Sequence, residues 1–203
     1  MFIRNSKIKK KGVALFIICI ACIQISGKYN FPERKIVFLS KFRIMNWREI
    51  RIAYREYSNL DELPDTWKDL VLNARSASLN AWSPYSGFKV GAAVRLESGR
   101  IIMGNNQENA AYPVGLCAER TALFYANANY PDDAVDMIAV SAQNAGGLVL
   151  KPVKPCGGCR QAMLEVEVRF NKKIQVILDG KESILVLDGI DSLLPLSFKP
   201  EAL

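Results

Sequence analysis

Three cysteines and one glutamate occupy two short segments of this chain, at spacings that suit metal chemistry. Cys117 and Glu119 are separated by one residue, and Cys156 and Cys159 by two. Two thiolates at the second spacing can bind one Zn²⁺ at a helix start, where the intervening glycines let the backbone fold around the metal. Cys117 would be a third ligand and would leave a tetrahedral position for water, as in catalytic zinc sites. Glu119 could then reach that water as a general acid and base.

The absence of histidine narrows the chemistry further. The chain contains no histidine, so hydrolases that use an imidazole base are excluded and a metal must bind cysteine or carboxylate. Taken singly, each residue has a simpler interpretation. Cys156 and Cys159 could be a redox pair or half of a structural zinc site, Cys117 a core thiol, and Glu119 an exposed acid in the first turn of a helix. Their joint occurrence favours the catalytic zinc site.

Helices and strands alternate along the part of the chain that carries these residues. A helix is predicted from Asp61, with Pro64 in its first turn, to the breaker cluster at residues 83–87. Residues 88–96 and 100–104 predict a hairpin that turns at Ser98 and Gly99. The remaining predicted elements are a helix opened by Cys117, a strand over 135–142, a helix over about 160–170, strands over 174–178 and 184–187, and a short helix capped by Asp191.

This order predicts an α/β fold, namely a three-layer α/β/α sandwich with a mixed, mainly five-stranded sheet. Right-handed crossovers would place the two cysteine-bearing helices on one face of the sheet, with their N-termini facing each other.

Charge divides the chain at residue 44. Residues 1–44 carry ten Lys or Arg and one acid, whereas residues 45–203 carry 17 basic and 19 acidic residues. The larger part therefore has no positive excess with which to hold nucleic acid, and we expect none as a partner.

The basic extension over residues 1–44 contains an apolar run at 13–23, shorter than the roughly 20 residues of a membrane span. Cys19 and Cys22 lie inside this run, and we interpret them as part of a hydrophobic segment. The extension could be an export signal or membrane anchor, a natural extension, or translated upstream sequence before a physiological start at Met45. We favour the last, because composition changes there and free thiolates suit a reducing cytoplasm.

Five motifs together resemble the small homotetrameric cytidine deaminases that act on free nucleosides. They are PYSGFKVGAA at 84–93, GNNQENAAY at 104–112, CAERTA at 117–122, PCGGCRQ at 155–161 and LLPLSF at 193–198. The cysteines and Glu119 match the three-cysteine form of the zinc deaminase signature. The resemblance covers residues 85–203, matches 45–60 only loosely and excludes 1–44. It implies a cytidine deaminase-like fold and a single catalytic domain over 45–203.

The resemblance also implies roles for individual residues. Cys117, Cys156 and Cys159 would bind one Zn²⁺ per chain, Glu119 would carry the proton, and Arg120 would offset the negative charge of the thiolates. The substrate would be contacted by Asn106 and Glu108 at the ribose 3′-hydroxyl, by Phe88 at the pyrimidine and by Ala118. Tyr112 and Phe198 would complete the site of a neighbouring subunit in a homotetramer. Ordinary core packing is the alternative for Phe88 and Phe198.

The implied function is hydrolytic deamination of cytidine and deoxycytidine in pyrimidine salvage, with a zinc-activated water, in the cytoplasm. Two alternatives stay open. One is the same chemistry on a nucleoside antibiotic or on cytosine in RNA; the other is a zinc scaffold without catalytic activity. The charge balance of residues 45–203 argues against RNA, and the presence of Glu119 argues against a scaffold.

Overall fold

The computed structural model describes residues 47–202, so the predicted extension over residues 1–44, with its apolar run and Cys19 and Cys22, and Met45 lie outside the described residues. Seven strands and three α-helices follow one another within the described range. In chain order they are β1 (Arg55–Tyr57), α2 (Asp65–Leu79), β2 (Lys89–Leu96), β3 (Ile101–Asn105), α3 (Ala118–Asn129), β4 (Val135–Asn144), β5 (Gly147–Leu148), α4 (Gly157–Phe170), β6 (Gln175–Leu178) and β7 (Ile184–Asp188). Single turns of 3-10 helix cover Leu60–Glu62, Tyr112–Val114, Ile190–Ser192 and Pro200–Ala202.

All seven strands belong to one mixed sheet, in the order β1-β7-β6-β4-β2-β3, with β5 paired to the end of β4. β4 and β6 are parallel, and the other neighbouring pairs are antiparallel. All five predicted strands are present, and the sheet contains two more than predicted, β1 and β5. These strands have three and two residues, too few for a recognisable alternation of apolar and polar side chains. Their partners β7 and β4 supply the hydrogen bonds that define them.

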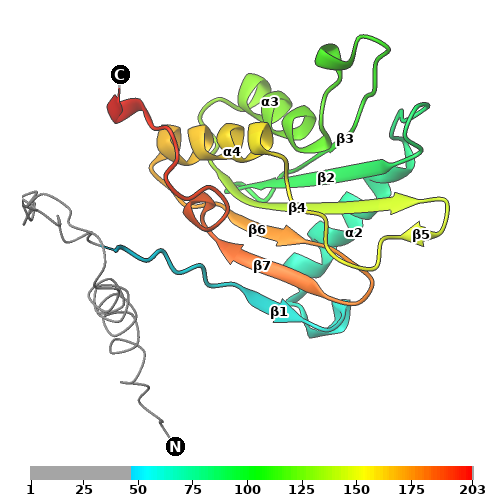
Figure 1. The fold of residues 1–203 in the computed structure, drawn as a ribbon, viewed down its shortest axis with the longest axis horizontal. Helices are drawn as coiled ribbons and strands as arrows, with labels where there is room; N and C mark the ends of the chain where they lie inside the picture. Colours follow the sequence, from blue (N-terminus) through cyan, green and yellow to red (C-terminus); the bar gives the residue numbers. More distant parts are fainter. Residues whose placement is uncertain (1–46, 203) are drawn as a thin grey trace, which may run out of the picture. The chain divides into compact units, whose positions relative to one another are not determined.

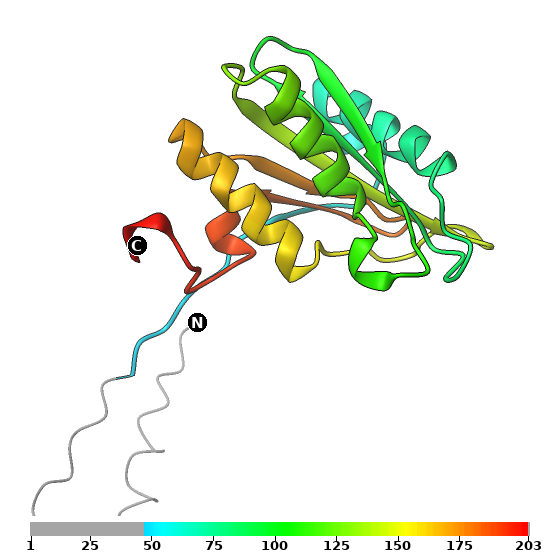
Figure 2. The ribbon, with the colours of Figure 1, turned by 90° about the horizontal axis from the view of Figure 1, so that it is seen from above.

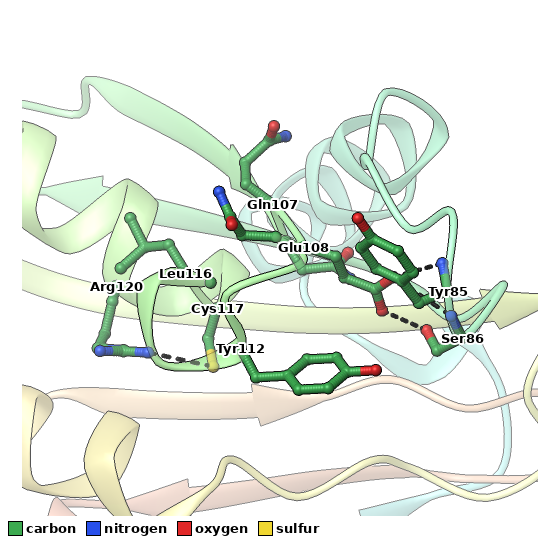
Figure 3. Close-up of a pocket in the computed structure, with 11 residues that line it drawn as sticks. Tyr85, Ser86, Gln107, Glu108, Tyr112, Leu116, Cys117 and Arg120 are labelled. Atoms are coloured by element: carbon green, nitrogen blue, oxygen red, sulfur yellow. Dashed lines mark hydrogen bonds between the residues drawn. The ribbon is translucent and has the colours of Figure 1, made fainter.

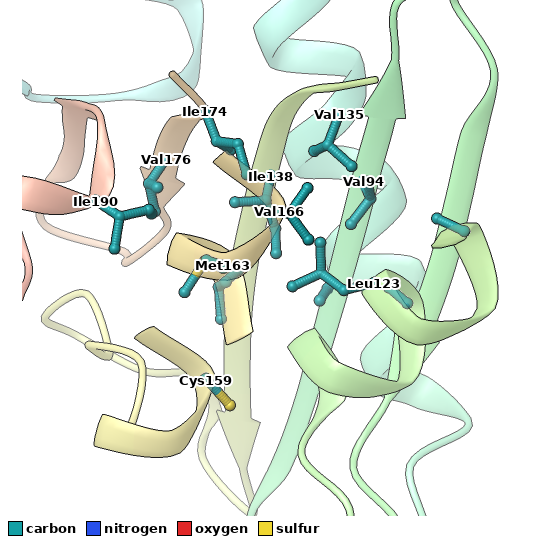
Figure 4. Close-up of a cluster of buried hydrophobic side chains, with 14 of the residues drawn as sticks. Val94, Leu123, Val135, Ile138, Cys159, Met163, Val166, Ile174, Val176 and Ile190 are labelled. Carbon is teal, nitrogen blue, oxygen red and sulfur yellow. The ribbon is translucent and has the colours of Figure 1, made fainter. Parts of the chain in front are cut away.

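Helices cover both faces of the sheet, as the three-layer prediction requires. Figure 2 shows α2 on one face and α3 beside α4 on the other. The side chains of β4 alternate accordingly: Ile138 and Val140 join the apolar cluster under α3 and α4, whereas Met137 and Ala139 join the cluster under α2. The larger cluster also contains Cys159 at its margin (Figure 4). No helix within residues 47–202 is long and apolar enough to cross a bilayer.

The connections explain why α3 and α4 share a face. β2 is antiparallel to both β3 and β4, so β3 and β4 run in the same direction. The chain passes from β3 through α3 to β4, and from β4 through α4 to β6, moving across the sheet in one direction (Figure 1). Crossovers of the same hand place both helices on one face, with their N-termini at the carboxyl ends of β3 and β4. The predicted arrangement of the two cysteine-bearing helices is confirmed.

Two glycines let the helices approach the sheet closely. A Cβ added at Gly104 of β3 would lie 2.6 Å from the Ala122 nitrogen and 2.7 Å from the Ala118 oxygen of α3. On the opposite face, a Cβ added at Gly91 of β2 would lie 2.0 Å from the Ala74 oxygen of α2. Any side chain at either position would push a helix away from the sheet.

Three predicted helix boundaries were wrong. α2 begins at Asp65 rather than at Asp61, because Asp61 lies in a separate 3-10 turn capped by the side chain of Asn59. Pro64 is the N-cap of α2, and its carbonyl accepts the first helical hydrogen bonds from Trp67 and Lys68.

The other two boundaries concern α4 and the last turn. α4 starts at Gly157, earlier than the predicted 160. The predicted short helix at Asp191 is a 3-10 turn whose N-cap is Gly189. Asp191 lies inside that turn and pairs with Lys199 at 3.3 Å instead of capping a helix.

We expect Gly104→Ala to lower the free energy of unfolding by about 1–3 kcal/mol, because the added methyl group overlaps the backbone of α3. Denaturant unfolding measures this change. Met103→Leu is the control on the same strand, since this side chain is 53% exposed and lies outside both buried clusters. An unfolding midpoint for Gly104→Ala equal to that of the wild type would contradict the close approach of α3 to β3.

Candidate active site

Two of the three cysteines are helix N-caps. Cys117 precedes α3 and Cys156 precedes α4, both with extended backbone angles and without a side-chain capping bond. Their carbonyls accept the first helical hydrogen bonds, from Thr121 and Arg160, at 3.0 Å each. Cys159 follows one turn into α4 and is fully buried. All three side chains therefore leave the backbone at the positive ends of helix dipoles, where a thiolate is stabilised.

The three sulfurs converge. The Cys117 and Cys156 Sγ atoms are 3.9 Å apart, the Cys156 and Cys159 Sγ atoms are 3.4 Å apart, and all three lie within 4.8 Å of one another. A tetrahedral Zn²⁺ with bonds of about 2.3 Å to sulfur separates its thiolates by about 3.8 Å. The donor set is therefore the right size and chemistry for zinc, and residues 47–202 provide three ligands rather than the four of a structural site.

Arg120 lies against this cluster. Its Nη2 donates to the Cys117 Sγ at 3.7 Å (Figure 3), while its Nε is buried and has no hydrogen-bond partner in the described structure. A hydrogen bond from the Cys159 thiol, followed by the one from Arg120, lowers the pKa of Cys117 to about 5. The bond to Cys117 and burial raise the pKa of the Cys159 thiol. The positive charge of the guanidinium therefore lies beside the sulfur of Cys117.

The carboxyl group of Glu119 lies close to the cysteines. It lies in the first turn of α3 with only 5% of its surface exposed. Burial raises the pKa of its carboxyl group, and the charge on Cys117 raises it further. A buried carboxyl group with a raised pKa can both accept and return a proton near neutral pH.

Arg160 of α4 holds the loop that leads into Cys156 by hydrogen bonds. Arg160 Nε donates to the carbonyl of Pro155 at 2.8 Å, and its Nη1 donates to the carbonyl of Leu193 at 2.6 Å. The segment before the ligand is therefore tied both to α4 and to the C-terminal part of the chain.

A cavity of about 520 Å³ opens beside Cys117 (Figure 3). Its lining comes from the turn before β2, the loop after β3 and the start of α3. The residues that line it are Tyr85, Ser86, Asn106, Gln107, Glu108, Asn109, Tyr112, Gly115, Leu116, Cys117 and Arg120. The rings of Tyr85 and Tyr112 pack edge to face, with centroids 6.2 Å apart. The volume suits a ligand of nucleoside size.

Glu108 is the acidic group of this cavity. One carboxylate oxygen accepts the backbone N–H of Tyr85 at 2.9 Å and of Ser86 at 3.2 Å, and the other accepts the Ser86 hydroxyl. The hydrogen bond from the Ser86 hydroxyl, then that from Tyr85, lowers the pKa of Glu108. The carboxylate therefore stays ionised at neutral pH.

Asn106 is anchored to the start of β2. Its side-chain oxygen accepts the backbone N–H of Val90 at 2.8 Å, and its side-chain nitrogen donates to the carbonyl of Phe88 at 3.0 Å. Both bonds fix the amide beside Glu108 on the wall of the cavity.

The structure thus brings together most of the residues singled out in the sequence. The three cysteines, Glu119 and Arg120 form one cluster, and Asn106, Glu108 and Tyr112 line the adjoining cavity. Ala118 is fully buried.

Phe88 and Phe198 do not line the cavity. Phe88 is half-buried at the entry to β2. Phe198 is 60% exposed, which excludes core packing within this chain, and its carbonyl accepts the side-chain N–H of Gln161 at 3.0 Å.

Sequence reasoning gave no role to Tyr85 and Ser86, because they stand in a segment of breaker residues. Only the fold brings that turn against Glu108, more than 20 positions later in the chain.

Comparison with known proteins points to one family. The family model described as the cytidine and deoxycytidylate deaminase zinc-binding region matches residues 65–174, which include Glu119 and the three cysteines. The cytidine deaminase of Halalkalibacterium halodurans is 46% identical over 97 residues, covering 48% of this chain and 69% of the relative. That of Sporosarcina psychrophila is 38% identical over 137 residues, covering 66% of this chain and 92% of the relative.

Solved structures agree with these matches. The crystal structure of cytidine deaminase from Burkholderia pseudomallei has a TM-score of 0.54 and 38% identity, covering 64% of this chain and 97% of that one. A mutant cytidine deaminase from Mycobacterium tuberculosis has a TM-score of 0.51 and 29% identity, covering 68% of this chain and 98% of that one.

We expect about one zinc ion per chain in protein purified under reducing conditions, and its loss from Cys156→Ala, because two thiolates hold Zn²⁺ too weakly. Metal analysis by atomic emission measures both. Cys156 is the exposed member of the cluster, so its truncation leaves the core intact. Glu165→Ala, an exposed change on α4, is the control and should retain zinc. Equal zinc in Cys156→Ala and the wild type would refute the site.

Proposed function

This chain belongs to the cytidine deaminase family, and on that premise we propose that it removes the amino group of cytidine and deoxycytidine by hydrolysis. The products are uridine or deoxyuridine and ammonia. The observation that carries this proposal is the convergence of three cysteine sulfurs within 4.8 Å, next to the buried carboxyl group of Glu119. The enzyme is a zinc-dependent deaminase, a hydrolase acting on the C–N bond of a cyclic amidine.

Glu119 carries the protons of the reaction. When bound by the three cysteines, Zn²⁺ is a Lewis acid that makes water a nucleophile at neutral pH. The Glu119 carboxylate takes the proton that water releases on attacking C4 of the cytosine ring and delivers it to N3. It then carries a second proton from the added hydroxyl group to the 4-amino group. The C4–N4 bond breaks, ammonia leaves, and a carbonyl remains at C4. The burial of Glu119 keeps bulk water from competing for these protons.

Arg120 and the helix N-termini balance the charge. Three thiolates around a divalent cation leave a net charge of about −1, which opposes the acidification of water. The Arg120 guanidinium donates to Cys117, and the positive ends of α3 and α4 meet at the sulfurs. We assign to these groups the withdrawal of charge from the thiolates.

Asn106 and Glu108 have the right unused bonding capacity for a ribose hydroxyl. Asn106 retains one amide N–H after its bonds to Phe88 and Val90, and Glu108 retains an acceptor position on Oε1. A hydroxyl group that accepts from the amide and donates to the carboxylate satisfies both. We assign this pair to the ribose 3′-hydroxyl. The family resemblance alone supports our assignment of Phe88 and Ala118 to the pyrimidine, since neither residue lines the cavity of this chain.

A homotetramer would account for the exposed aromatic and apolar side chains. Phe198 is 60% exposed, Leu196 93% and Tyr112 77%, and α3 adds exposed Phe124 and Tyr125. We propose four equivalent subunits with dihedral symmetry, in which Phe198 and Tyr112 complete a neighbouring subunit's site. Tyr112 also lines the cavity of its own chain.

The cellular role follows from the chemistry. Free thiolates at the metal site require a reducing compartment, so we propose that the enzyme acts in the cytoplasm, in pyrimidine salvage. We further propose that residues 45–203 form the catalytic domain and that residues 1–44 are not needed for catalysis.

Glu119→Gln should retain zinc and the fold but lose at least 99% of turnover, because an amide cannot carry a proton. The ultraviolet absorbance of cytidine, followed over time, measures turnover. Glu182→Gln is the matched control on the surface and should behave like the wild type. Turnover of Glu119→Gln within about tenfold of the wild type, an effect of roughly 1.4 kcal/mol, would remove Glu119 from this role.

Phe198→Ala should raise KM for cytidine roughly fivefold, because loss of an aromatic contact with the base costs about 1 kcal/mol. Mixing it with Glu119→Gln subunits should restore part of the activity, since the two defects fall in different subunits' sites. Light scattering of the wild type should report a tetramer. A fully active monomer, or no recovery in mixtures that exchange subunits, would refute the shared site.

A chain that begins at Met45 should be as active as the full chain and should hold the same amount of zinc. Steady-state kinetics and metal analysis of the two proteins side by side test this. Loss of zinc or activity on truncation would make residues 1–44 a working part of the enzyme.

A further inference from the structure

Ser86 stands between two residues assigned to the substrate. It is an exposed residue in the turn before β2, which is closed by a hydrogen bond from the Gly87 nitrogen to the Ser83 oxygen at 3.0 Å. Gly87 has a φ of +66°, a conformation that glycine adopts without strain. The Ser86 hydroxyl donates to Glu108 Oε1 and accepts the backbone N–H of Phe88 at 3.0 Å. One hydroxyl group therefore contacts both the carboxylate and the aromatic residue.

The contacts of Glu108 define which part of its carboxylate is open. Oε2 accepts two backbone N–H groups, from Tyr85 and Ser86, and so uses both of its acceptor positions. Oε1 accepts only the Ser86 hydroxyl, which leaves one acceptor position for a ligand. The three donors together prevent rotation of the carboxylate and determine where that open position points.

Ser86 supplies the side-chain donor to the Glu108 carboxylate. Among residues 47–202, Glu108 forms no ion pair with Lys or Arg, so no cation orients the carboxylate. The other two donors are backbone groups that belong to the same turn. Figure 3 shows Ser86 and Tyr85 approaching the carboxylate from one side, and the Cys117 end of the cavity lies away from them.

We propose that Ser86 is a positioning residue for nucleoside binding, whose hydroxyl group orients the open oxygen of Glu108 toward the ribose 3′-hydroxyl of the substrate. This role rests on the proposed function. It predicts an effect that depends on the sugar: a substrate without the 3′-hydroxyl makes no bond to Glu108, so it loses nothing when Ser86 is removed. The hydroxyl contact is remote from C4 and is the same before and during the reaction. Its loss should therefore raise KM and leave kcat unchanged.

The test compares cytidine with 3′-deoxycytidine as substrates of the full-length zinc enzyme. For Ser86→Ala we expect KM for cytidine to rise about tenfold with kcat within twofold of the wild type. The kcat/KM for 3′-deoxycytidine should stay unchanged. Ser86→Thr keeps the hydroxyl and has space for the methyl group at this exposed position, so it should lie within threefold of the wild type on both substrates. Ser83→Ala in the same turn is the control and should match the wild type.

The ratio of kcat/KM for the two substrates is the deciding number, because it does not depend on the fraction of correctly folded enzyme. An equal loss on both substrates, or no change on cytidine, overturns the positioning role of Ser86 while leaving the deaminase function intact. Absence of cytidine turnover by the wild-type enzyme overturns the proposed function, and the Ser86 role with it.

Discussion

The meeting of two helix N-termini at one edge of the sheet is the constraint on which the site depends. β3 and β4 run in the same direction because β2 is antiparallel to both, and each is followed by a crossover helix on the same face. The segments that follow their carboxyl ends therefore converge, and each delivers a cysteine at a helix N-cap. Segments almost 40 positions apart in the chain thus bring their sulfurs to 3.9 Å.

This convergence also determines the electrostatics. Three sulfur ligands concentrate negative charge, and two helix ends together with Arg120 concentrate positive charge at the same place. Glu119, two residues after the N-cap Cys117, is carried into the buried first turn of α3. The close packing of α3 on Gly104 sets the depth of this turn, so a strand residue without a side chain controls the position of the Glu119 carboxyl group.

The two ends of the cavity are built differently. The end with the three cysteines is supported by the hydrophobic core, since Cys159 is fully buried and belongs to the cluster that contains Ile138 and Met163 (Figure 4). The far end is made from turns and loops whose shape depends on polar contacts, chiefly those of Glu108 and Asn106. In the proposed function, the cysteine cluster on the core serves a reaction at one fixed atom, and the loops supply the hydrogen bonds to the sugar.

The sequence alone predicted the cysteine cluster that the structure shows and most of the architecture. The sequence singles out two close pairs, Cys117 with Glu119 and Cys156 with Cys159. Residues separated by only one or two others stay near each other in space whatever the fold, so their spacing is informative without a structure. All five predicted strands and all three α-helices have strong local patterns, and they appear in the structure within a few residues of their predicted ends.

Tertiary structure decided everything that depends on contacts between distant segments. β1 is a strand because it pairs with β7, and β5 because it pairs with β4. Two or three residues are too few for a sequence pattern that would predict either strand. The sequence predicted Asp61 and Asp191 as helix caps, but each lies inside a 3-10 turn whose N-cap is another residue, Asn59 or Gly189. The hydrogen bond from Ser86 to Glu108 joins the turn before β2 to the loop after β3. These two segments become neighbours only when the chain folds. Local propensity acts over a few residues, whereas these pairings depend on where the chain returns in space.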